Sequence, residues 1–193
     1  MNQQQIAGLI LILGFVFVLA ASFVGPPKLY QEPNVNRQLE LIANHSAAWT
    51  ASNLFYALAG LVTAGGLTLY SLQFWGTGSM WLVGAGATAY LIGAITYTIF
   101  LYRRTVAPAV LFNNYVFTPL TVILLGALVV GLLLYGIVFL QVGYPVWLGV
   151  GMIAGMAMIG GAALLFPARF FQSFPPQVFF LFTLIVGIVV LRQ

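Results

Sequence analysis

The feature that most constrains this chain is the placement of its few charged residues. Only 4% of the 193 positions are Asp, Glu, Lys or Arg, and all eight lie outside the long apolar runs. They occur in four places, namely within 28–40, at 103–104, at 169 and at 192. Because a charge at the centre of a bilayer costs about 2.5–3.5 kcal/mol, the uncharged intervals mark segments that can cross a membrane.

The overall composition supports the same conclusion. Hydrophobic residues make up 62% of the chain, whereas soluble domains contain about 45–50%. A soluble protein of this length could not bury that much apolar surface, so lipid must cover part of it. We therefore predict an all-α integral membrane protein that forms a single membrane domain over residues 1–193.

Six segments are long and apolar enough to cross a bilayer as helices, since a spanning helix needs about 20 such residues. Gly, Pro or Arg bounds each of them, and Thr118 and Pro119 resemble a helix start. The expected spans are approximately 6–24, 47–74, 80–102, 118–140, 145–166 and 175–191. The first is expected to be a retained anchor because no charged side chain precedes it, although Ala20-Ala21-Ser22 keeps a cleaved signal peptide open as the alternative.

Counting Lys and Arg in the loops predicts the orientation, because cytoplasmic loops carry the excess of positive charge. Five basic residues fall in the first, third and fifth loops, namely Lys28, Arg37, Arg103, Arg104 and Arg169. The other side holds only Arg192 and the α-amino group. We therefore expect loops 1, 3 and 5 in the cytoplasm, both termini outside, and residence in the plasma membrane, which is the inner membrane of a bacterial cell.

The longest polar stretch, between the first two spans, contains a predicted helix over 33–46. Asn34 is its expected N-cap. Apolar residues recur at helical spacing, at Val35, Leu39, Ile42 and Trp49, and the other face carries Asn36, Arg37, Glu40 and Asn44. The favoured interpretation is a short amphipathic helix at the membrane interface, anchored by Trp49; a docking surface for a partner subunit is the alternative.

Three residues are the candidates for binding a cofactor or lipid. His45 is the chain's one histidine and has the chemistry of a ligand or pH sensor, although a solvated polar residue is the favoured interpretation. Arg103 and Arg104 have the chemistry to hold an anionic headgroup or the rim of a quinone. The favoured interpretation of this pair is a cytoplasmic stop signal.

Small residues inside the spans predict close helix packing, because lipid provides no hydrophobic drive for helix association. The candidate packing positions are Gly60, Ala64, Ala85, Ala89, Gly93, Gly151 and Gly155. A similar pattern of small residues occurs in the second and fifth spans. The second span contains Ala59-Gly60 and Gly65-Gly66, and the fifth contains Ala154-Gly155 and Gly160-Gly161. This similarity raises the alternative of an inverted repeat.

The composition also limits the chemistry of the chain. It contains no Cys, no Asp and one His, which excludes disulfides, thiolate metal sites and a Ser-His-Asp triad from this chain alone. Its formal net charge of +4 is spread over several loops, unlike the basic patch of a nucleic-acid-binding protein. We expect no catalytic residues, cofactor, metal or nucleic-acid partner.

The favoured function is a non-catalytic multipass subunit or scaffold of a larger membrane assembly, of the respiratory or photosynthetic kind. Its expected partners are the lipid bilayer and other membrane subunits. The alternative is a small transporter or channel for a neutral or lipidic molecule. A membrane enzyme acting on lipids ranks last, because only Glu32, Glu40 and His45 could supply acid-base chemistry and they form no known motif.

Overall fold

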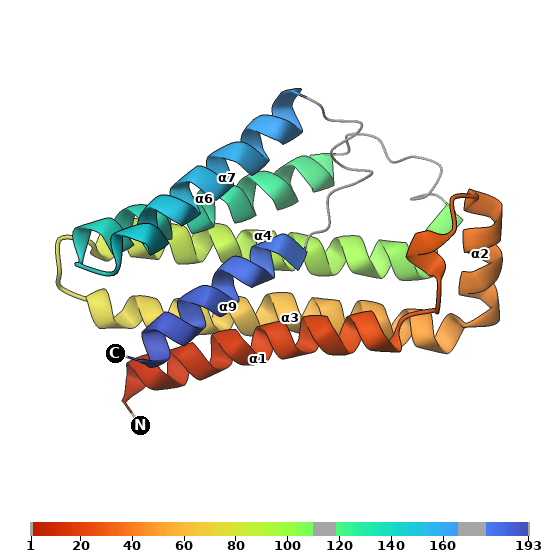
Figure 1. Cartoon of the computed structure of the whole chain (residues 1–193), viewed down its shortest axis with the longest axis horizontal. Coiled ribbons are helices and arrows are strands. Elements are labelled where there is room, and N and C mark those ends of the chain that lie inside the picture. Colours follow the sequence, from red (N-terminus) through yellow and green to blue (C-terminus); the bar gives the residue numbers. More distant parts are fainter. Residues whose placement is uncertain (1, 110–118, 166–176, 193) are drawn as a thin grey trace.

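A computed structural model of the chain describes residues 2–109, 119–165 and 177–192, and within these ranges all regular structure is helical. The long helices run back and forth along the longest axis of the molecule (Figure 1). They are α1 (Gln3–Val24), α3 (Ser46–Ser71), α4 (Met80–Val106), α6 (Pro119–Gln141), α7 (Val146–Leu165) and α9 (Gln177–Leu191). Shorter helices are η1 (Leu29–Gln31), α2 (Val35–Asn44) and η2 (Leu72–Phe74), the last of which continues α3.

Five of these helices are long and apolar enough to cross a bilayer, which is consistent with a helical membrane bundle. They are α1, α3 with η2, α4, α6 and α7. The sixth apolar helix, α9, has 15 residues and therefore rises about 22 Å. That is less than the hydrocarbon thickness of about 30 Å. Residues 166–176, where the sequence places the start of the sixth span, lie outside the described ranges.

Local signals explain the start of α1 and the end of α4. The Asn2 side chain accepts a hydrogen bond from Gln5 N, and the Gln5 side chain accepts one from Asn2 N, which forms a capping box at the start of α1. Helix α4 continues four residues beyond the expected end of the third span at 102, through both arginines to Val106. Long Arg side chains can extend toward the interface from inside a helix, whereas Pro108 disfavours helical backbone at Ala107. Proline, not arginine, therefore ends α4.

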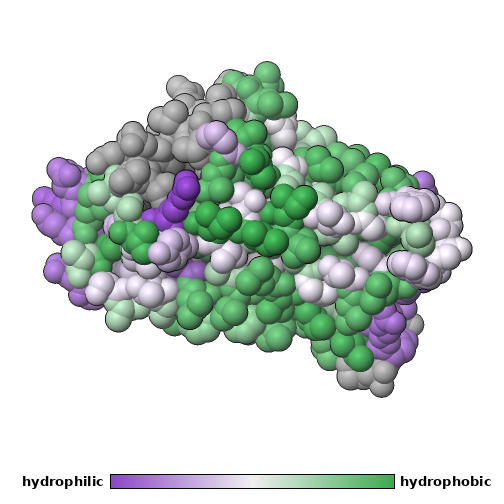
Figure 2. Space-filling view, turned by 180° about the vertical axis from the view of Figure 1, so that it is seen from behind, coloured by the Kyte–Doolittle hydropathy of each residue, from purple (hydrophilic) through white to green (hydrophobic). Residues whose placement is uncertain are grey.

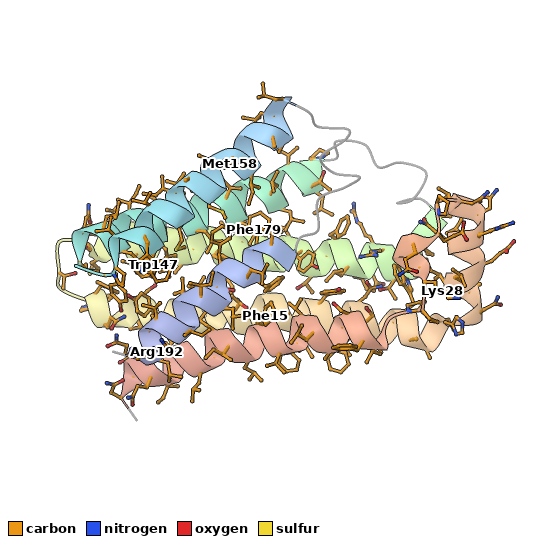
Figure 3. The ribbon with its side chains drawn as sticks, viewed as in Figure 1. Phe15, Lys28, Trp147, Met158, Phe179 and Arg192 are labelled. Atoms are coloured by element: carbon orange, nitrogen blue, oxygen red, sulfur yellow. The ribbon has the colours of Figure 1, made fainter. Side chains whose placement is uncertain are left out.

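Each long helix from α1 to α7 packs against the long helix that follows it in the sequence. The pairs are α1 with α3, α3 with α4, α4 with α6 and α6 with α7. Helix α9 crosses the bundle obliquely and packs mainly against α1 (Figure 1). The alternative of an inverted repeat stays a prediction; α7 does face α9, at Gly155 and Phe182. The start of α1 and Arg192 lie at one end of the bundle, here called the terminal end, and α2 lies at the opposite end, the α2 end (Figures 1 and 3).

The outer surface carries large apolar side chains in the pattern expected of a lipid-facing bundle. Figure 2 shows apolar residues across the middle of the rear face and hydrophilic residues mainly toward the two ends. On α4, Trp81 is 80% exposed and Tyr102 is 67% exposed, with exposed Ile92, Ile95 and other aliphatic residues between them. The two aromatics are about 32 Å apart along the helix, which matches one hydrocarbon thickness bounded by interfacial aromatic residues.

Candidate functional site

The best-defined group of predicted site residues lies at the α2 end, around a small buried cluster of Leu29, Ile42 and Trp49. We call these three residues the Trp49 cluster. They come from η1, α2 and the first turns of α3, and their exposed fractions are 1%, 5% and 2%. Burial of these side chains fixes the loop after α1 and the helix α2 against the bundle. The basic residues at this end are thereby held on a defined framework.

Trp49 connects this cluster to the C-terminal end of α4. The guanidinium carbon of Arg104 lies 4.4 Å from the centroid of the Trp49 ring, which is a cation–π contact. The indole Nε1–H of Trp49 donates a hydrogen bond of 3.3 Å to the Arg104 carbonyl oxygen. One residue of α3 therefore binds both the side chain and the backbone of Arg104. The expected role of Trp49 as a lipid-facing anchor is wrong, because the side chain is buried inside the protein.

A second polar contact between α3 and α4 lies one helical turn further along α3. Asn53 Nδ2 donates to Thr105 Oγ1 at 3.0 Å, and Thr105 Oγ1 donates to Leu101 O at 2.8 Å. The Asn53 side chain is buried, and its Oδ1 atom has no hydrogen-bond partner among the residues that the structure describes. A buried acceptor without a partner is costly, so this position combines one stabilising contact with one unsatisfied group.

The structure separates the three candidate binding residues. His45 is exposed and forms the corner between α2 and α3, where its backbone N–H donates to Leu41 O and Ile42 O and its carbonyl accepts from Trp49 N. Arg104 is half-buried against Trp49, whereas Arg103 is exposed on α4 beside Tyr102. Among the residues that the structure describes, no group of three or more His, Asp or Glu side chains comes together in a way that could hold a metal ion.

The candidate packing residues divide into two groups. Gly60 faces Ala94 and Tyr97 of α4, Gly93 faces Leu128 of α6, Gly155 faces Phe182 of α9, and Ala64 is buried. In contrast, Ala85 and Gly151 are exposed and Ala89 is half-exposed. Close contacts are made instead by glycines beside these exposed positions. Gly86, next to Ala85, makes them on α4, and Gly149, two residues before Gly151, makes them on α7.

Three pairs of helices meet at glycines that face each other, an arrangement that sequence reasoning missed. The pairs are Gly8 with Gly187 (α1 and α9), Gly86 with Gly131 (α4 and α6) and Gly136 with Gly149 (α6 and α7). In each pair, a Cβ atom on either glycine would lie between 2.8 and 3.2 Å from the other glycine's carbonyl oxygen. Glycine therefore allows backbone-to-backbone contact at all three crossings. The glycines are visible in the sequence, but their pairing depends on which helices are neighbours.

A polar aromatic group lies near the terminal end. Tyr135 and Ser71 share a hydrogen bond of 2.6 Å between α6 and α3, and the Tyr135 hydroxyl donates to Leu67 O at 2.9 Å. The rings of Tyr70, Phe139 and Tyr144 pack next to them, with centroids 4.9–6.3 Å apart. Gln4 Nε2 donates to the Tyr144 hydroxyl at 3.2 Å. Burial raises the pKa of Tyr144, which lies in the loop between α6 and α7.

No known family matches this chain. Models of protein families, curated protein sequences and solved structures were all compared with it, and none matches. Inferences about function therefore depend on the residues and contacts described above.

Proposed function

We propose that this chain is a non-catalytic multipass subunit or scaffold of a larger membrane assembly, of the respiratory or photosynthetic kind. The observation that carries the proposal is a set of glycines on the outer surface. Gly65, Gly84, Gly126 and Gly151 lie on four different helices and are exposed, and no described residue lies within 4 Å of a Cβ added to any of them. Glycine disfavours a helix by about 1 kcal/mol relative to alanine, and these four serve no packing contact with the part of the chain that the structure describes. They permit close approach of a second protein's helix.

The proposal includes six spans, with α9 and the residues before it as the sixth. Lys28, Arg37, Arg103 and Arg104 are all at the α2 end, and Arg192 is at the terminal end (Figures 1 and 3). This distribution supports a cytoplasmic α2 end in the plasma membrane, with both termini outside. In this arrangement α2 lies at the interface, with Asn36, Arg37 and Glu40 exposed and Ile42 buried.

Purification from the native membrane in mild detergent, followed by native mass spectrometry, tests the proposal. We expect a hetero-complex that contains at least one further membrane protein. Substitution of Gly126 or Gly151 by Leu should reduce the yield of the complex without unfolding the chain. The matched controls are Leu substitutions at Val130 and Val150, which are also exposed on α6 and α7. Recovery of the chain alone, whatever the variant, would contradict the proposal.

A second candidate, a transporter or channel for a neutral or lipidic molecule, is favoured by two buried hydroxyl groups. Thr63 Oγ1 and Tyr70 Oη both lie on α3 and both are fully buried. Among the described residues, Thr63 Oγ1 has no hydrogen-bond partner, and the Tyr70 hydroxyl has at most the hydroxyl of Tyr144 beside it. A polar solute or water passing along α3 would satisfy them. Flux of neutral solutes into proteoliposomes, reduced by Thr63→Val or Tyr70→Phe but not by the exposed control Tyr102→Phe, would support this candidate. Absence of flux would remove it.

A further inference from the structure

We infer that residues 29–44, here called the strap, open and close as one unit over Trp49 at the α2 end. The strap contains η1 and α2, and it turns about two hinges, one at 25–28 and the other at His45. This inference goes beyond the proposed scaffold role and does not depend on any partner subunit. It rests on three features of the described residues, namely a small buried contact with the bundle, hydrogen bonds that stay within the strap and its hinges, and unfavourable backbone at one hinge.

One small cluster joins the strap to the described part of the bundle. Leu29 of η1 and Ile42 of α2 are buried against Trp49 of α3, and Ile42 is the one buried residue among the ten of α2. The Trp49 cluster shares no residue with the two larger clusters that fill the bundle. Segments that bury few apolar side chains open at a lower free-energy cost than core helices do. The strap can therefore open while the long helices stay packed.

Hydrogen bonds hold η1 and α2 together as one body. Gln38 Nε2 donates to Glu32 O at 2.6 Å, and Asn34 N donates to the Glu32 carboxylate at 3.0 Å. The Asn34 side chain also caps the first turn of α2. Every hydrogen bond that the structure describes for the strap lies within residues 26–45. Opening therefore breaks no described hydrogen bond between the strap and a long helix.

The two ends of the strap have backbone geometry suited to hinges. Gly25 follows the last residue of α1, and Lys28 has a φ of 61° and a ψ of 3°, in the left-handed region. His45, between α2 and α3, has a φ of −126° and a ψ of 41°, and its side chain caps neither helix. Hinges are typically a few loop or element-terminal residues that absorb the change in φ and ψ. Rotation at these two places moves η1 and α2 together.

The backbone of Lys28 favours opening. Among the described residues, Lys28 is the one non-glycine with positive φ. Left-handed backbone is unfavourable for a residue with a Cβ atom, and it persists only where the surrounding structure imposes it. Here the next residue, Leu29, is buried in the Trp49 cluster. When Leu29 leaves the cluster, Lys28 can return to an ordinary φ, so part of the cost of opening is recovered.

Opening changes the surroundings of Trp49 without breaking its contacts with α4. The cation–π contact with Arg104 and the hydrogen bond to the Arg104 carbonyl join α3 to α4 and do not involve the strap. Figure 1 shows α2 across the end of the bundle, so its displacement exposes the side of Trp49 that faces the strap. Tryptophan is favourable at the boundary between hydrocarbon and headgroups. The closed strap buries Trp49 in protein, and the open strap leaves it available to the membrane interface.

Hydrogen–deuterium exchange of the full chain in phosphatidylcholine nanodiscs tests the inference, under conditions in which the exchange rate reports the opening equilibrium. We expect the hydrogen-bonded amides of α2 to exchange together, at least about tenfold faster than those of α3 and α4. Ile42→Ala should speed exchange of α2 by a further factor of about 30, because truncation of a buried Ile is strongly destabilising, while exchange in α1 and α4 stays unchanged. Asn36→Ala, at an exposed position of α2, is the matched control and should leave the rate nearly unchanged.

A change at the first hinge should act in the opposite direction. Lys28→Gly relieves the left-handed backbone of the closed strap and should slow exchange of α2 by about threefold. Lys28→Ala is the control, because it removes the charge but keeps a Cβ atom, and it should exchange as the wild type does. If Ile42→Ala fails to fold, this pair of variants decides the result, because Lys28 is exposed.

Three outcomes would overturn the inference. Exchange of α2 at the same rate as α3 in the wild type would show that the strap opens only when the bundle unfolds. An equal increase in α1 and α4 in Ile42→Ala would show global destabilisation instead of opening of the strap. Exchange in Lys28→Gly as fast as in Lys28→Ala would exclude the first hinge.

Discussion

Gly86 of α4 and Gly131 of α6 lie against each other's backbone. A Cβ on Gly86 would lie 3.2 Å from the carbonyl oxygen of Gly131, and a Cβ on Gly131 would lie 3.0 Å from both the carbonyl oxygen of Gly86 and the amide nitrogen of Tyr90. Backbone atoms cannot move aside as a flexible side chain can. The distance between α4 and α6 at this crossing therefore requires glycine at both positions.

Substitution of Gly131 by Ala should separate α4 from α6 and destabilise the bundle. Overpacking of a well-packed interior costs typically about 1–3 kcal/mol, and the obstacle here is backbone on the facing helix. The matched control on the same helix is Gly126→Ala, where no described residue lies within 4 Å of an added Cβ. This control should be neutral or slightly stabilising, because alanine favours a helix more than glycine does. Free energies of unfolding in mixed detergent micelles would distinguish the two, and equal effects would contradict the role assigned to the Gly86–Gly131 crossing.

Sequence reasoning located the helices but not their rotation about their own axes. Hydropathy and Gly or Pro punctuation place five long helices within a few residues of their observed ends. Small residues, however, occur next to each other, as at Ala85 and Gly86. Only the neighbouring helix decides which of the two faces inward, and the structure buries Gly86 and exposes Ala85. Spacing within one helix contains no information about its neighbour.

The candidate site shows the same limit. The arginines at 103–104 are conspicuous in the sequence because they interrupt an apolar run. Their difference is not visible there: Arg104 stacks on Trp49 and Arg103 is exposed. Trp49 belongs to another helix, so this contact depends on tertiary packing. The buried hydrogen bond between Ser71 and Tyr135 is a second case, since neither residue belongs to a recognisable motif.

The hydrogen bond between Ser71 and Tyr135 should contribute measurably to the packing of α3 against α6. Tyr135→Phe removes its contacts with Ser71 Oγ and Leu67 O together, and we expect a loss of about 1 kcal/mol in the free energy of unfolding. Ser71→Ala should cost less, because Tyr135 keeps its hydrogen bond to Leu67 O. A double-mutant cycle measures the coupling of the pair, and Tyr102→Phe, at an exposed position, is the control. A coupling of zero would show that the 2.6 Å contact adds no stability.

The contact between Asn53 and Thr105 predicts an asymmetry between two variants. Thr105→Val leaves Asn53 Nδ2 buried without an acceptor, beside an Oδ1 atom that already has no partner. Its expected cost is about 1–3 kcal/mol. Asn53→Leu removes both amide atoms, while Thr105 Oγ1 keeps its hydrogen bond to Leu101 O, so this variant should be nearly neutral. Thermal unfolding monitored by helical circular dichroism measures both. A greater loss in Asn53→Leu than in Thr105→Val would show that the amide is better satisfied than the structure indicates.

The proposed orientation predicts opposite labelling of two loops. The chain has no native cysteine, so single-cysteine variants need no background mutations. Ser79→Cys, in the loop between α3 and α4 at the terminal end, should react with a membrane-impermeant maleimide added to intact cells. Arg37→Cys, on the exposed face of α2, should react only after the cells are permeabilised. The reverse pattern would place the α2 end outside, in conflict with the distribution of positive charge.

The raised pKa of Tyr144 predicts a loss of stability in alkaline solution. Burial disfavours the phenolate in the folded protein, so the folded pKa exceeds the ordinary value of about 10. The neutral phenol therefore contributes its full stability below pH 10, and this contribution is lost as the pH rises from 10 toward the folded pKa. Between pH 9 and pH 11, the melting temperature of the wild type in detergent should fall further than that of Tyr144→Phe. Tyr102→Phe, which removes an exposed phenol, should follow the wild type; if Tyr144→Phe does so as well, ionisation of Tyr144 has no part in the alkaline transition.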